Sequence, residues 1–196
     1  MGVKKLIYSV IVALAAMIGS MSNASAQWVV TDPGAYVKMG LTTAQAAATV
    51  KTLADYSEKF KDLYRAVEKI QRYQEIAIGT KECGEILYRI SQRGTFFPEF
   101  VQSGCFTENE LEAVYSYYQV MSEDAIKQFN IVKACFKDEA FKQNMSIKDL
   151  LDIVNQTRDK LLAIQYSMTR LNSATYGTMR YRVNTQRDIQ RHCSFY

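Results

Sequence analysis

Apolar residues recur at spacings of three and four along two long stretches of the chain, 41–78 and 105–176. This spacing places them on one face of an α-helix, and no segment alternates apolar and polar residues for long enough to predict a strand. The apolar positions of the first stretch are Leu53, Tyr56, Phe60, Leu63, Val67, Ile70 and Ala77. We expect one long helix here, starting at a capping box of Thr42 and Gln45 and ending at Gly79.

The second stretch predicts two helices joined by a turn at the polar cluster 142–144. Capping boxes mark both helix starts, Thr107 with Glu110 and Ser146 with Asp149. The short connection makes the two helices antiparallel neighbours. Their apolar faces are formed by Leu111, Val114, Tyr118, Met121, Ala125, Val132 and Cys135, and by Ile147, Leu150, Val154, Thr157, Leu161, Ile164, Met168 and Leu171.

Residues that disfavour helix interiors cluster between the two stretches, namely Gly79, Gly84, Gly94, Pro98 and Gly104. They predict a loop-rich insert at 80–106 with a short helix around Glu85–Gln92. The predicted fold class is therefore all-α. We expect an elongated antiparallel bundle of three long helices within residues 42–196, with this insert and a basic C-terminal segment at 178–196.

The first 26 residues have the three regions of a secretory signal peptide. Lys4 and Lys5 precede an apolar run at 6–18, and Ala24-Ser25-Ala26 offers a cleavage site. A membrane-spanning helix needs about 20 apolar residues, so we expect cleavage after Ala26 rather than a retained anchor. No later apolar run is long enough to cross a membrane, and the mature chain is expected to have no membrane span.

Composition argues against several classes of function. The chain has 24 Lys and Arg against 20 Asp and Glu, a balance that does not predict direct nucleic acid binding. His192 is the only imidazole and lies in the C-terminal tail, and no phosphate-binding loop or nucleophile motif occurs. We therefore predict that the protein is not an enzyme and has no catalytic residue, cofactor or metal site.

Four cysteines follow the predicted signal peptide: Cys83, Cys105, Cys135 and Cys193. An even number in an exported chain predicts two disulfides, with a metal site as the alternative. Cys83 and Cys105 flank the insert and could join its ends. Cys135 could meet Cys193 only if the chain turned back at Gly177, and otherwise Cys193 would compete for a partner near the insert.

Two segments are candidate contacts with partners. Residues 27–41 are expected to be extended before the first helix, with Trp28 and Val30 either packed on the bundle core or inserted into a neighbouring subunit. The tail has Asp188 as its only acid. It either docks on an acidic partner surface or lipid headgroups, or packs its apolar residues and leaves its arginines solvated. The arginines in question are Arg180, Arg182 and Arg187.

The signal peptide is followed directly by Gln27-Trp28-Val29-Val30-Thr31-Asp32-Pro33 and then by long helices. In this order the chain resembles the TrbJ-type conjugal transfer proteins, minor pilus subunits of bacterial type IV secretion systems. The resemblance implies a periplasmic or extracellular subunit near the tip of a conjugative pilus. It would act in pilus assembly or contact with the recipient cell, with other secretion or pilus subunits as partners, and the resemblance implies no ligand residues. The chain departs from the family pattern at 34–36 and in its four cysteines. A periplasmic helical binding module or chaperone for a small ligand or client peptide is the alternative function.

Overall fold

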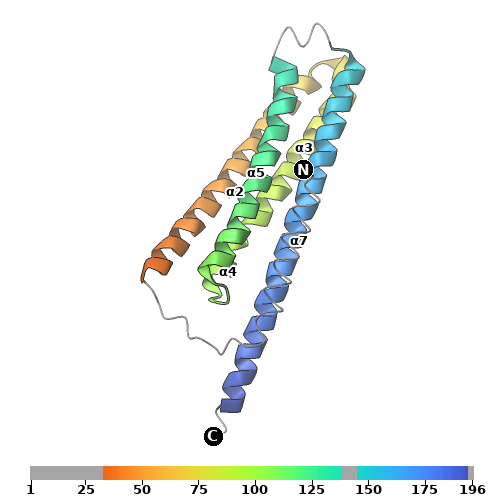
Figure 1. Cartoon of the computed structure of the whole chain (residues 1–196). Coiled ribbons are helices and arrows are strands. Elements are labelled where there is room, and N and C mark those ends of the chain that lie inside the picture. The colour runs from red at the N-terminus through yellow and green to blue at the C-terminus, as the bar shows by residue number, and fades with distance from the viewer. Residues whose placement is uncertain (1–32, 138–144, 194–196) are drawn as a thin grey trace. The chain divides into compact units, whose positions relative to one another are not determined.

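A computed structural model describes residues 33–137 and 145–193 of the chain (Figure 1). The chain divides into two units between Val37 and Lys38, and of the first unit only residues 33–37, the start of a helix, are described. The contacts below all belong to the second unit. The predicted signal peptide, Trp28, Val30 and the turn at 142–144 lie outside the described residues.

All regular structure in the described residues is helical, which confirms the predicted all-α class for this part of the chain (Figure 1). The elements are α2 (Pro33–Glu68), the 3-10 helix η2 (Gln71–Tyr73), α3 (Gln74–Gly94), α4 (Phe97–Gln102), α5 (Glu108–Lys137) and α7 (Ile147–Cys193). None of these helices is both long enough and apolar enough to cross a membrane.

The capping boxes predicted for the later helices are formed. At α5, the Thr107 N–H donates to Glu110 Oε2 at 2.8 Å, and the Glu110 N–H donates back to Thr107 Oγ1 at 3.4 Å. At α7, the Ser146 N–H donates to Asp149 Oδ2 and the Asp149 N–H donates to Ser146 Oγ, both at 3.1 Å. The hydrogen bonds from Ser146 lower the pKa of Asp149. Both helices begin one residue after their predicted capping residue.

The limits of α2 differ from the prediction at both ends. α2 begins at Pro33, so residues 33–41 are helical rather than extended. Proline suits the first position of a helix because its ring fixes φ and no N–H partner is needed there. α2 ends at Glu68 instead of Gly79, and the chain reverses through η2. The reversal allows Val67 and Ile76, 3% and 0% exposed, to be buried on either side of it.

Residues 80–106, predicted as a loop-rich insert, contain most of α3 and all of α4. The glycines of α3 lie where neighbouring helices approach it most closely. A Cβ added to Gly84 would lie 2.9 Å from Phe60 Cβ, and one added to Gly94 would lie 2.5 Å from Val50 Cγ2. Gly84 makes room for α2 inside the helix, and Gly94, the last residue of α3, makes room for α2 at its end. The described part therefore has four long helices where three were predicted.

Contacts between residues far apart in the sequence fix the direction of each helix. α3 and α7 run in the same direction, whereas α5 runs opposite to α7 and α2 runs opposite to α3. For α3 and α7 the contacts are Cys83 with Val154 and Arg93 with Asn172. For α5 and α7 they are Glu110 with Arg182 and Tyr118 with Asn172. For α2 and α3 they are Ser57 with Gly84 and Val50 with Gly94. Figure 1 shows α2, α5 and α7 side by side, with α3 behind them.

The core contains the apolar stripes seen in the sequence, together with residues of α3 and α4 that the sequence did not place there, such as Leu87, Ile90 and Phe100. Every apolar position predicted for α5 is buried, and Phe129 joins them with T-shaped ring contacts to Tyr56 and Phe60 of α2. Of the positions predicted for α7, Leu150, Val154, Thr157, Leu161, Met168 and Leu171 are buried and Ile164 is partly buried. Ile70 and Ile147, 41% and 46% exposed, are the exceptions at helix ends.

α7 continues through Gly177 as one helix as far as Cys193. A Cβ added at Gly177 would meet no atom within 4 Å, so the position is open. The reversal considered at Gly177 is absent, and the segment after 178 extends α7 instead of returning along the bundle.

Candidate functional site

The second half of α7 is attached by polar contacts to the segment that connects α3 with α5. Arg182 makes the strongest of them, a bidentate ion pair with Glu110. Its Nη2 donates to Glu110 Oε1 at 2.7 Å, and its Nη1 donates to Glu110 Oε2 at 2.9 Å and to the Cys105 carbonyl at 2.7 Å. The guanidinium carbon lies 5.4 Å from the ring centre of Phe106. The paired side chains are only 16% and 18% exposed.

This arrangement stabilises the charged form of both groups. The Arg182 hydrogen bond is the main cause that lowers the pKa of Glu110, and the hydrogen bond to Glu110 raises the pKa of Arg182. Arg182 was a candidate contact for a partner, but the structure engages it within the chain. The Glu110 carboxylate thus both caps α5 through Thr107 and holds α7 through Arg182.

A second polar contact lies deeper in the bundle, between α3, α5 and α7. Asn172 Nδ2 donates to the Arg93 carbonyl at 2.8 Å, and the Tyr118 hydroxyl contacts both that carbonyl and Asn172 Oδ1. Tyr118 and Asn172 are 4% and 6% exposed, and burial raises the pKa of Tyr118. The phenol therefore remains neutral, and the cluster satisfies buried polar groups while aligning three helices.

Tyr176 makes the third contact, one turn after Asn172. Its hydroxyl donates to the Glu99 carboxylate, and its ring packs edge-on at 5.7 Å from Phe96 and 4.9 Å from Phe100. Burial, followed by the hydrogen bond to Glu99, raises the pKa of Tyr176 to about 12. We refer to Asn172, Tyr176 and Arg182 as the α7 fastening residues.

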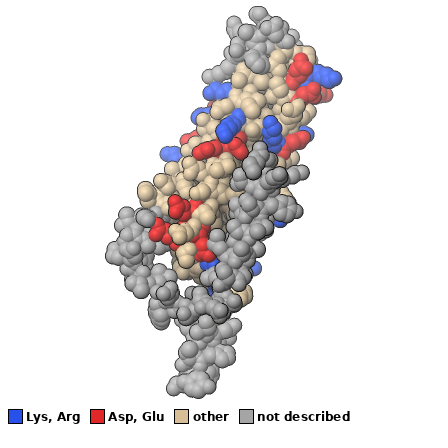
Figure 2. Space-filling view, in the orientation of Figure 1, with Lys and Arg blue, Asp and Glu red and all other residues tan. Residues whose placement is uncertain are grey.

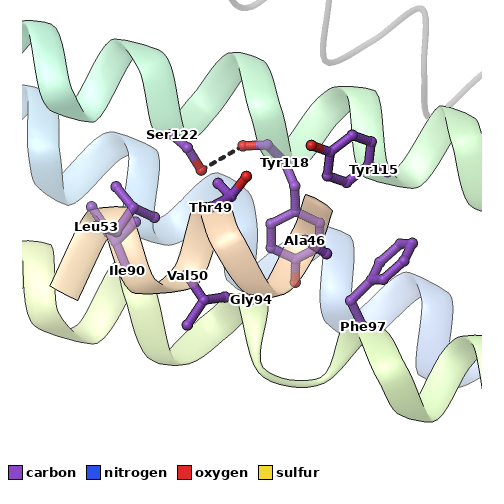
Figure 3. A pocket seen from close by; sticks show the side chains of 10 residues that line it. All are labelled: Ala46, Thr49, Val50, Leu53, Ile90, Gly94, Phe97, Tyr115, Tyr118 and Ser122. Atoms are coloured by element: carbon purple, nitrogen blue, oxygen red, sulfur yellow. Dashed lines mark hydrogen bonds between the residues drawn. The ribbon is translucent and has the colours of Figure 1, made fainter. Parts of the chain in front are cut away.

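A small cavity lies between α2, α3, α4 and α5 beside Tyr118 (Figure 3). In Figure 3 the Ser122 hydroxyl donates to the Tyr118 carbonyl, and the lining side chains come from these four helices. The cavity measures about 10 Å³, which is room for about one water molecule. Pockets for organic ligands are typically about 300 Å³ or larger, so this cavity is a packing gap. Its lining consists of Ala46, Thr49, Val50, Leu53, Ile90, Gly94, Phe97, Tyr115, Tyr118 and Ser122.

The cysteines are not brought together in pairs in the described structure. Cys83, Cys105 and Cys135 are buried free thiols, and the side chain of Cys193 lies outside what the structure describes. Cys83 lies at the level of Val154, whereas Cys105 lies at Arg182, about 42 Å further along α7. The two ends of the predicted insert are therefore too far apart for a disulfide.

The absence of a reversal at Gly177 also affects the second predicted pair. α7 runs without a break from Ile147, which follows Cys135 by one connection, to Cys193. The two cysteines are thus placed at opposite ends of α7. Burial raises the pKa of the Cys83 thiol to about 12, which makes it unreactive in the folded protein. Among the described residues no group of three or more His, Cys, Asp or Glu could hold a metal ion.

Arg180 and Arg187, the other predicted contact residues of the tail, are exposed. They belong to a longer exposed strip of α7 that begins before the predicted C-terminal segment 178–196. Arg170 stacks over Tyr166 at 5.8 Å, and Tyr166 and Tyr181 are 65% and 68% exposed. We define the outer face of α7 as Tyr166, Arg170, Arg180, Tyr181 and Arg187. Tyrosine and arginine are among the residues enriched in protein interfaces, which makes this strip the main candidate functional surface.

No protein-family model, no curated protein and no solved structure matches the chain. We therefore infer the function from the residues and contacts described above.

Proposed function

We propose that the chain is an exported structural or adhesive subunit of a bacterial conjugation apparatus of the type IV secretion kind. It would act in pilus assembly or cell contact during DNA transfer, in the periplasm or on the pilus, with other secretion or pilus subunits as partners. The observation that carries the proposal is the order of the first 33 residues, a signal-peptide pattern followed directly by Gln27–Pro33.

The described helices suit such a role. An antiparallel bundle of long helices would supply a stable framework, with its polar contacts used internally at Glu110, Tyr118 and Glu99. The exposed arginines and tyrosines of α7 would then be available to partners. In this proposal contacts between protein subunits, rather than a reaction or direct nucleic acid binding, are the function.

The alternative function, a binding module for a small ligand, requires a pocket between helices. The cavity beside Tyr118 has room for about one water molecule, which argues against an organic ligand at that place. A client peptide would have to bind to the surface instead. We therefore keep the subunit proposal as the better supported of the two.

A deletion of the gene in a conjugating donor strain tests the proposal. We expect DNA transfer to fall by at least about a hundredfold while DNA processing in the donor continues, because the defect would lie in the envelope. The full chain supplied in trans should restore transfer, and a chain without residues 2–26 should not. Normal transfer from the deletion strain would contradict the proposal.

A Trp28→Ala variant distinguishes the two arrangements of residues 27–32. If Trp28 inserts into a neighbouring subunit, the exported variant should lose association with pilus or channel components and keep its melting temperature. If Trp28 packs on the bundle, the melting temperature should fall and association should persist.

A further inference from the structure

Acidic and basic residues are segregated along the chain in the half of the bundle that contains the α7 fastening residues. Between Arg93 and Lys127 there are six acidic residues and no basic one, whereas between Asp159 and Asp188 there are five basic residues and no acidic one. Figure 2 shows acidic side chains gathered on the lower part of the visible face, while both signs are mixed higher up. The segregation therefore creates surfaces of opposite sign on one molecule.

Part of this charge is used internally, and part remains exposed. Glu110 and Arg182 neutralise each other in the ion pair described above. Glu112 and Glu123 on α5 are exposed, as are Arg170 and Arg180 on α7. We call Glu112, Glu123 and Val120, which is 52% exposed, the outer face of α5.

The two outer faces point in different directions. Glu112 comes two residues after Glu110, which meets α7, and therefore lies about 200° around α5 on the side turned away from α7. Arg180 comes two residues before Arg182, which meets α5, and lies on the side of α7 turned away from α5. Glu112 and Arg180 thus lie on opposite sides of the α5–α7 pair, and they cannot neutralise each other within one chain.

The exposed charges also match in spacing and in level. Glu112 and Glu123 are about 16 Å apart along α5, and Arg170 and Arg180 are about 15 Å apart along α7. The ion pair between Glu110 and Arg182 places Glu112 at the level of Arg180, because the two helices run in opposite directions. The contact of Tyr118 with Asn172 places Glu123 within about one turn of Arg170.

We propose that a second copy of this chain binds the outer face of α7 through its own outer face of α5. A copy displaced sideways without rotation would bring Glu112 to Arg180 and Glu123 to Arg170. Tyr166 and Tyr181 would supply apolar area around these ion pairs. The contact joins two different surfaces, so each added copy leaves one face open and the association continues as a series. This inference goes beyond the proposed role in conjugation and does not depend on it.

Sedimentation velocity of the exported, processed chain tests the contact. The weight-average mass should rise with protein concentration beyond that of a dimer, and added salt should lower it because the interface is charged. Two double variants, Arg170→Glu with Arg180→Glu and Glu112→Lys with Glu123→Lys, should each sediment as monomers. An equimolar mixture of the two should associate again, since each altered face then meets a face of opposite sign.

The matched control is Lys51→Glu with Lys81→Glu, which reverses two exposed charges outside both faces. This control should associate like the unaltered chain, and all variants should keep its melting temperature within about 2 °C. A monomer mass for the unaltered chain at all concentrations, or a variant mixture that stays monomeric, would overturn the proposal. So would association that stops at a dimer. None of these results bears on the DNA-transfer test, so the two proposals fail separately.

Discussion

The two halves of α7 are held in the bundle by different chemistry. The first half buries Leu150, Val154, Leu161 and Met168, each 3% exposed or less. It also packs closely on α3, where a Cβ on Gly79 would lie 2.7 Å from Val154 Cγ1. The second half buries Leu171 and packs Met179 and Val183 against the core, and it is also held by the fastening residues, through hydrogen bonds to Arg93, Glu99 and Glu110.

Apolar contacts and polar contacts contribute differently to the stability of the bundle and to the alignment of its helices. Burial of apolar side chains supplies most of the favourable free energy, but it is non-directional. Buried polar groups have directional partners, and a helix that slides by one turn leaves them unsatisfied at a cost of about 1–3 kcal/mol each. We infer that the first half of α7 supplies stability and the second half fixes its register against α3 and α5.

The largest effect is expected in the apolar region. Phe60→Ala should lower the free energy of unfolding by about 3–5 kcal/mol, because Phe60 is 0% exposed and packs at 4.8 Å on the ring of Phe129. Urea denaturation followed by circular dichroism measures this loss. Tyr166→Ala, at a position that is 65% exposed, is the matched control and should change stability by less than about 0.5 kcal/mol. A loss below about 1 kcal/mol for Phe60→Ala would mean that α2 is not seated on this core.

The next largest effect on stability is expected at the ion pair between Glu110 and Arg182, in the second half of α7. Glu110→Gln should cost about 2 kcal/mol at pH 7, since the charge-assisted hydrogen bonds of a mostly buried arginine are lost. Arg182→Gln should cost a similar amount, and the double variant should cost less than the sum of the two. Additive losses in this cycle would show that the two side chains are not coupled.

The same pair predicts a pH dependence. The pKa of Glu110 is lowered in the folded chain, so its stabilising contribution is complete above the ordinary carboxylate pKa of about 4.3. That contribution should disappear as the pH falls below this value. The difference in stability between the unaltered chain and Glu110→Gln should therefore shrink as the pH falls below about 4.3. A difference that is independent of pH would contradict the assigned pair.

Alanine substitutions at Gly84 and Gly177 compare a glycine that is closely packed with one on an open helix surface. Gly84→Ala should destabilise the chain by about 1–3 kcal/mol, because its Cβ would lie 2.9 Å from Phe60 Cβ. Gly177→Ala should stabilise it by about 0.5–1 kcal/mol, because alanine favours a helix and the position is open. Thermal unfolding of the two variants should show a lower melting temperature for Gly84→Ala and a higher one for Gly177→Ala. A destabilising Gly177→Ala would indicate that α7 breaks there.

The smallest effect is expected at Tyr176. Tyr176→Phe removes the hydrogen bond to Glu99 but keeps the ring contacts with Phe96 and Phe100, so the loss should be at most about 1 kcal/mol. Tyr181→Phe, at a position that is 68% exposed, should have no measurable effect on the melting temperature. Equal losses of stability for Tyr176→Phe and Tyr181→Phe would show that the Tyr176 hydroxyl does not help to hold α7.

Local patterns predicted the features that depend on local interactions. The stripes of α5 and α7 and the capping boxes at Thr107 and Ser146 involve residues within a few positions of one another, and the structure confirms them. Only the part of α3 around Glu85–Gln92 was predicted as a separate helix, because the glycines of α3 were taken to mark helix ends. Their actual role depends on Phe60 and Val50 of α2, to which no local pattern points.

The candidate site depended on distant contacts even more strongly. Arg182 was named as a candidate partner contact because the tail has Asp188 as its only acid, and no local pattern pointed to Glu110, 72 residues away. Asn172 interrupts no apolar stripe and gave no signal, although it is 6% exposed. The outer face of α7 could have been found from the absence of acidic residues between Asp159 and Asp188, had the tail not been treated as starting at 178.

The parallel pairing of α3 with α7 determines how the chain can fold. The partners of α3 are synthesised late, because Cys83 contacts Val154 across 71 positions and Arg93 contacts Asn172 across 79. Until α7 is present, the apolar face of α3 has no complete cover, and helices of this kind fold more slowly than bundles built from local contacts. In a chain truncated before Leu150, the apolar residues of α3 should therefore remain without their native packing. The complete chain should reach its native packing only after its last helix has formed.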